Sequence, residues 1–225
     1  MASVLSMLLG DGRFPAGSYA HSLGLEQAIA DGLEAEAVSD FIAARLRLVA
    51  EPEARIAVAA RRGARSDGVE GALAVDEEFA ARCPSPVLRE SARRLGGALL
   101  RSAAAVWPAA DAALIERYRH ASPTTPRPVA LGVVAAATGL ADEQLAALAL
   151  YDDAATVASA ALKLLPLDPA DASRWVAELR RWIEAAARTV AADGRPLAEQ
   201  PAPAAIGLEL AAAVHHDRRE RLFVS

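Results

Sequence analysis

Apolar residues recur with helical spacing along most of the chain. Between positions 39 and 62 they follow an i, i+3/i+4, i+7 pattern, which predicts two consecutive half-buried helices with a break or restart near Pro52. The same spacing predicts a helix over 67–82, which ends at the sequence Cys83-Pro84-Ser85-Pro86. No alternation of period two is long enough to build a sheet.

The next predicted helix covers 86–106, with proline at its first position, and stops before Trp107-Pro108. Its centre contains Gly96-Gly97, and each glycine costs a helix about 1 kcal/mol relative to alanine. Either another segment approaches the helix closely at this point or the helix bends there.

Further helices are predicted over 128–138, 142–164 and 170–190, after a loop at 121–128 that contains three prolines. Because helical segments flank this loop, we place it inside a single domain. We therefore expect an all-α fold, one domain of about nine or ten helices over 1–191.

Residues 192–205, which contain three prolines and a glycine, are predicted to form a linker. Residues 206–225 are expected to form a short amphipathic helix and a flexible, partner-binding C-terminal tail.

Composition supports this interpretation and excludes several classes of protein. About a quarter of the residues are alanine and only 4% are aromatic, which favours helix over sheet. The net charge is −5 and the basic residues are mixed with acidic ones, so we expect no nucleic-acid partner. No uninterrupted apolar run approaches the roughly 20 residues that span a bilayer. With one cysteine, Cys83, and no recognisable signal peptide, we expect a soluble cytoplasmic protein without disulfides.

The sequence lacks recognisable catalytic motifs. The glycines of residues 10–17 are not followed by the Lys-Ser/Thr of a phosphate-binding loop, and no nucleophile elbow is present. We expect no catalytic residue, no bound cofactor and no metal site. One alternative stays open, because the pair His215-His216 with neighbouring acids suggests direct nickel binding. Adjacent histidines on a helix point about 100° apart, which favours simple exposed tail residues.

The stretch FPAGSYAHSLGLEQA, residues 14–28, combines an extended turn with a predicted helix over 19–30. Tyr19, His21, Ser22 and Glu26 are polar or amphipathic groups on or beside its first turn, and Gly24 removes side-chain bulk nearby. These features fit a docking surface as well as a capped surface helix.

Lys163 is the single lysine among 24 basic residues. It falls in the last turn of the predicted helix 142–164, where any cation complements the negative end of the helix. Arginine would serve that purpose equally well, so the choice of lysine suggests a specific contact.

Four segments together resemble the urease accessory protein UreF family. FPAGSYAHSLGLE resembles the family's N-terminal signature, ALKLLPLDP its Lys-Leu-x-Pro-Leu segment, and HHDRRERLFVS its C-terminal ending, while RESARRLGGALL is similar to an internal helix. The chain departs from the family pattern at Asp168-Pro169, where Gly-Gln is usual, and by an insertion after His120.

The resemblance implies an all-helical homodimer without catalysis of its own. Such a protein bridges the accessory protein UreD (UreH in some species) and the GTPase UreG while nickel is delivered to apo-urease. Two sets of residues would then contact partners. The set facing UreG would be Pro15, Tyr19, His21, Ser22, Glu26 and Lys163; the set facing UreD would be His215, Arg221, Leu222, Phe223 and Ser225.

Overall fold

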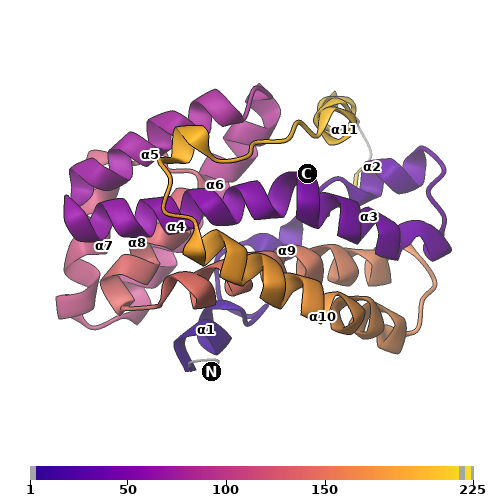
Figure 1. The fold of residues 1–225 in the computed structure, drawn as a ribbon. Coiled ribbons are helices and arrows are strands. Elements are labelled where there is room, and N and C mark those ends of the chain that lie inside the picture. The colour runs from indigo at the N-terminus through magenta and orange to yellow at the C-terminus, as the bar shows by residue number, and fades with distance from the viewer. Residues whose placement is uncertain (1–3, 218–220, 224–225) are drawn as a thin grey trace.

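The computed structural model describes residues 4–217 and 221–223, and this part of the chain is built from helices without any strand (Figure 1). The all-α prediction is thereby confirmed. The described elements, in chain order, are α1 (Val4–Leu9), η1 (Ser18–Ala20), α2 (Leu25–Ala30), η2 (Ala35–Ala37), α3 (Val38–Arg45), η3 (Leu46–Ala50), α4 (Glu51–Ser66), α5 (Val69–Arg82), α6 (Pro86–Val106), α7 (Ala109–Ala121), α8 (Arg127–Thr138), α9 (Asp142–Leu164), α10 (Pro169–Ala192), η4 (Leu197–Glu199) and α11 (Ile206–Asp217).

The helices α3 and α4 form one continuous rod, joined through the π-helical turn η3. The prediction of two separate helices is wrong here, because the residues at both junctions keep right-handed helical dihedral angles. In a regular α-helix the ring of Pro52 would clash with the carbonyl of Leu48 and leave it without a hydrogen bond. The wider π turn lies directly before Pro52 and adjusts the hydrogen-bonding pattern at that point.

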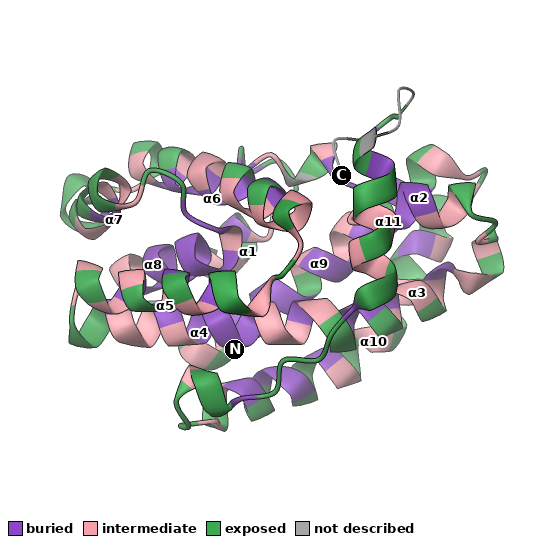
Figure 2. Cartoon of the chain, turned by 90° about the horizontal axis from the view of Figure 1, so that it is seen from above, coloured by how far each residue is buried: buried purple, intermediate pink, exposed green. Residues whose placement is uncertain are grey.

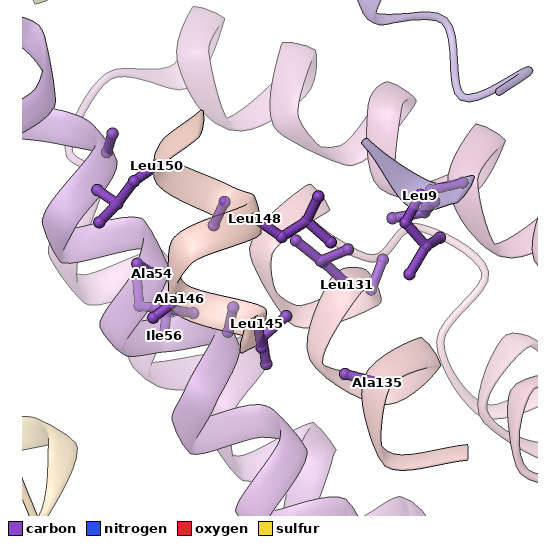
Figure 3. Close-up of a cluster of buried hydrophobic side chains, with 14 of the residues drawn as sticks. Leu9, Ala54, Ile56, Leu131, Ala135, Leu145, Ala146, Leu148 and Leu150 are labelled. Atoms are coloured by element: carbon purple, nitrogen blue, oxygen red, sulfur yellow. The ribbon is translucent and has the colours of Figure 1, made fainter. Parts of the chain in front are cut away.

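The core is organised around α9, which packs against α4 and α10. Figure 3 shows its leucine and alanine side chains beside Ala54 and Ile56 of α4 and Leu131 of α8. Leu145 and Leu150 of α9 are fully buried. By length and composition α9 is apolar enough to cross a membrane, but 56% of its apolar window is buried inside the protein. We therefore regard it as a core helix.

The close approach predicted at Gly96-Gly97 is present at the first glycine only. A Cβ atom on Gly96 would overlap the carbonyl oxygen of Thr125 and lie 2.7 Å from the carbonyl carbon of Pro126. A Cβ on Gly97 would meet only the flexible guanidinium of Arg101, at 3.4 Å, and a more distant carbonyl. The proline-rich loop before α8 thus rests directly on the backbone of α6.

Alanine substitutions at these two glycines are expected to have opposite effects. Gly96→Ala should lower the free energy of unfolding by about 1–3 kcal/mol, because the backbone of the loop must move. Gly97→Ala should raise it by up to about 1 kcal/mol through helix propensity. Urea denaturation of the two variants measures both changes, and equal stabilisation by both would contradict the close packing.

The last part of the chain returns across the bundle. Residues 193–205 follow α10 and include η4, which contacts α4 and α5. The Arg82 guanidinium donates to the carbonyl oxygens of Leu197 and Gln200. Helix α11 then lies against α2 and α6, with a largely exposed outer side (Figure 2). The division into domain 1–191, linker 192–205 and tail 206–225 stays a prediction.

Candidate functional site

The N-terminal signature folds as a short 3₁₀ turn, η1, followed by a tight turn and helix α2. The predicted continuous helix over 19–30 is wrong, because Leu23 and Gly24 have positive φ angles of 55° and 92°. Such angles interrupt a right-handed helix and favour glycine. A Cβ on Gly24 would lie 3.4 Å from the side chain of Leu208, so α11 packs closely over this turn.

A buried ion pair between Arg45 and Asp153 stabilises the turn at Leu23-Gly24. Arg45 donates from Nε and Nη2 to the carboxylate of Asp153, at 3.0 and 2.9 Å, and both residues are 8% exposed. The remaining Nη1 of Arg45 donates to the carbonyl oxygen of Leu23 at 3.1 Å. The pair therefore connects α3 and α9 to the strained turn.

Glu26, in the first turn of α2, binds the C-terminal segment. Its Oε1 accepts a hydrogen bond from the backbone N–H of Leu222 at 2.6 Å, and its Oε2 accepts one from Phe223 N–H at 3.0 Å. The Nε2 of His215 lies 3.6 Å from the same Oε2. Because Glu26 and Phe223 are both buried, these contacts fix the end of the described chain against its beginning.

Lys163 joins the same group from the last turn of α9. Its Nζ donates to the carbonyl oxygen of Tyr19 at 3.2 Å and lies 5.1 Å from the centre of the Phe223 ring. The second distance is typical of a cation–π contact. We call the six residues that meet here the terminal cluster: Tyr19, Glu26, Lys163, His215, Leu222 and Phe223.

The other residues predicted to contact a partner lie outside this cluster or beyond the described residues. Pro15 is exposed, and its carbonyl oxygen accepts a hydrogen bond from Ser102. His21 and Ser22 are buried; burial, together with Arg94 and Arg127, lowers the pKa of His21 to about 4. The remaining two are Arg221, which is exposed, and Ser225, which lies outside the described residues.

The histidine pair does not form a joint face in this structure. His215 is buried and directed at Glu26 and the Phe223 carbonyl, whereas His216 is exposed. Within the described part of the chain, no three His, Cys, Asp or Glu side chains are grouped closely enough to hold a metal ion. The geometry therefore gives no support to the nickel-binding alternative.

The fold and the terminal cluster together define an all-α protein whose two terminal segments are bound to each other through buried polar contacts. The UreF family model matches residues 33–180. Urease accessory protein UreF of Mycobacterium marinum is 36% identical over 235 aligned positions, covering 99% of this chain and all of that protein. The UreF of Mycobacterium sp. strain JLS is 35% identical over the full length of both chains.

The UreF of Mycobacterium tuberculosis is 35% identical over 77% of this chain and 78% of its own. The chain therefore belongs to the UreF family of urease accessory proteins. Membership gives it an accessory role, alongside other factors of urease assembly.

Proposed function

We propose that this protein is a cytoplasmic, homodimeric adaptor that bridges UreD (UreH) and the GTPase UreG while nickel is inserted into apo-urease. Membership of the UreF family over nearly the whole chain supports this role. The observation that carries it is the terminal cluster, in which residues from both predicted partner surfaces touch one another. Contact between the two sets of residues would let one partner influence the binding of the other.

We divide the predicted residues by their exposure into contacting and supporting groups. Tyr19 is 69% exposed and Lys163 is also exposed, so both are available to a partner such as UreG. His21, Ser22 and Glu26 are buried, so we assign them a supporting role. We therefore assign the direct contacts to Pro15, Tyr19 and Lys163.

Helix α11 offers an apolar surface for the scaffold partner. Ile206, Leu210 and Val214 are 65%, 64% and 55% exposed, and their i, i+4, i+8 spacing puts them on one side of the helix. Leu222 continues the exposed apolar surface in the tail with 64% exposure. An apolar helix face with this spacing suits docking into a groove of another protein, here UreD.

Co-expression with UreD and UreG tests the proposal. In size-exclusion chromatography with light scattering, the full chain is expected to form a two-fold complex containing both partners. A variant ending at Ala213 should no longer bind UreD, because it lacks Val214 and Leu222 of the exposed apolar surface and also the tail residues that Glu26 holds. Leu222→Ser should also weaken UreD binding, but without releasing the tail, since it removes an exposed apolar side chain of the proposed surface and keeps the backbone N–H that binds Glu26. Failure of the full chain to bind either partner would refute the adaptor role.

Replacing Lys163 with methionine is expected to weaken UreG binding about 5- to 30-fold. The substitution keeps the length of the side chain and removes the charge, while one exposed contact of this kind contributes about 1–2 kcal/mol. Phe223→Leu is the control, since it removes the ring that Lys163 contacts but leaves the ammonium. If Lys163 only held the tail, both variants would weaken UreG binding equally. Wild-type affinity in the methionine variant would remove the assignment.

A further inference from the structure

A cavity of about 170 Å³ lies beneath the segment 202–212, between α4, α6 and α9. Most of its wall is aliphatic, with side chains that include Leu48, Val49, Ile56, Leu88, Leu95 and Leu208. For comparison, an engineered apolar cavity of about 150 Å³ in another protein binds benzene. The volume here suits an apolar group about the size of one aromatic ring.

The floor of the cavity is lined by more acidic than basic side chains. Arg45 is paired with Asp153 at 2.9 Å, and Arg127 with Asp152 at 2.6 Å. Glu53 is a third carboxylate on the same wall, and within the described residues no hydrogen bond or ion pair engages it. Three carboxyl groups thus face two guanidinium groups, and the carboxyl group of Glu53 is the one without a paired cation.

The outer part of the wall does not supply the missing positive charge. Arg82 lines the cavity, but its guanidinium is paired with Glu78 at 2.8 Å. Glu209 of α11 adds a further carboxylate to the lining. His21 is neutral at pH 7, because burial and neighbouring arginines lower its pKa to about 4. None of these groups therefore provides a free cation for Glu53.

The surroundings of Glu53 make its charge costly in the empty cavity. Burial raises the pKa of its carboxyl group, and the nearby charge of Asp153 adds to this effect, whereas Arg45 and Arg127 oppose it. A carboxylate in an apolar environment is stabilised most effectively by a partner of opposite charge that also donates hydrogen bonds. A ligand with one positive charge would supply both.

We propose that this cavity is a binding site for a small organic monocation, with an ammonium or guanidinium group at Glu53 and a ring-sized apolar body against the leucines. The aliphatic wall determines the body of the ligand, and the unpaired carboxyl group of Glu53 determines its charge. The roof is formed by Ala202, Pro203, Ala205, Leu208 and Ala212, so that a bound molecule would lie directly under the segment that leads to the terminal cluster.

Isothermal titration of the full-length protein with benzylamine, which is cationic at pH 7, tests the site. Benzyl alcohol is the neutral molecule of the same shape. Wild-type protein is expected to bind benzylamine at least about tenfold more tightly than benzyl alcohol, because only the amine pairs with the carboxylate. Equal affinity for the two molecules would overturn the proposal.

Variants locate the interaction. Glu53→Gln should bring the affinity for benzylamine down to that for benzyl alcohol, whereas Glu70→Gln on the exposed side of α5 should change neither. Ala92→Leu adds bulk to the cavity wall and should lower the affinity for both benzylamine and benzyl alcohol. Unchanged benzylamine binding in Glu53→Gln or Ala92→Leu would also overturn the proposal. Because the titration needs no partner protein, its result is independent of the adaptor role.

Discussion

Replacing Asp153 with alanine is expected to lower the free energy of unfolding by about 3–5 kcal/mol, the range for one lost partner of a buried ion pair. Arg45 would keep its charge in a site where it is only 8% exposed, without the carboxylate that accepts two of its N–H groups. Urea denaturation followed by circular dichroism measures the loss. The amides around Leu23 should also exchange faster, because Arg45 holds the carbonyl of that residue.

Two controls separate this effect from a general cost of substitution. The double variant Arg45→Met/Asp153→Leu removes both charges. It should lower the free energy of unfolding far less than Asp153→Ala does. Asp171→Ala breaks an exposed pair with Arg174 and should cost less than about 1 kcal/mol. A loss below about 1 kcal/mol for Asp153→Ala would show that the pair does not hold the core.

Replacing Glu26 with alanine is expected to release the C-terminal segment from the body of the protein. The carboxylate accepts hydrogen bonds from the N–H groups of Leu222 and Phe223, and each bond to a charged group contributes about 1.5–3 kcal/mol. Hydrogen exchange measured by mass spectrometry should therefore show protection of the tail reduced by more than about 100-fold. The amides of α9 should keep their protection, since the core does not depend on this contact.

Glu26→Gln provides a graded comparison, because the amide retains one acceptor oxygen without the charge. The hydrogen-exchange protection of the tail in this variant should lie between that of the wild type and that of the alanine variant. Glu36→Ala, at an exposed position in η2, is the matched control and should leave the tail protected. If the tail of Glu26→Ala remained as protected as in wild type, the hydrogen bonds to the carboxylate would not be what holds it.

The helices could be predicted wherever the signals were local. The helix predicted over 142–164 coincides with α9, and the one over 86–106 coincides with α6, because proline, glycine and apolar spacing mark both ends within the sequence itself. The predictions failed where tertiary contacts decide the backbone. The turn at Leu23-Gly24 depends on Arg45 and Leu208, which are far away in the sequence, and no local pattern reports them.

The same contrast between local signals and tertiary contacts applies to the candidate site. Composition singled out Lys163, and the N-terminal signature drew attention to Tyr19 and Glu26. Their contact with the tail could not be foreseen, because a single sequence carries no signal that pairs residues nearly 200 positions apart. The cavity was missed for a related reason, since its carboxylates and guanidinium groups come from separate helices and share no motif. At Gly96 the sequence indicated a close approach but could not identify Thr125 as the neighbour.

The hydrogen bonds at Glu26 also have a consequence for the order of folding. The partners of this carboxylate are 196 and 197 residues further along the chain, so the second residue of α2 completes its bonding only after residues 222 and 223 have been synthesised. Closing so long a loop is slow compared with forming the neighbouring helices. The helical bundle can therefore assemble first, and the segment 221–223 docks against α2 afterwards.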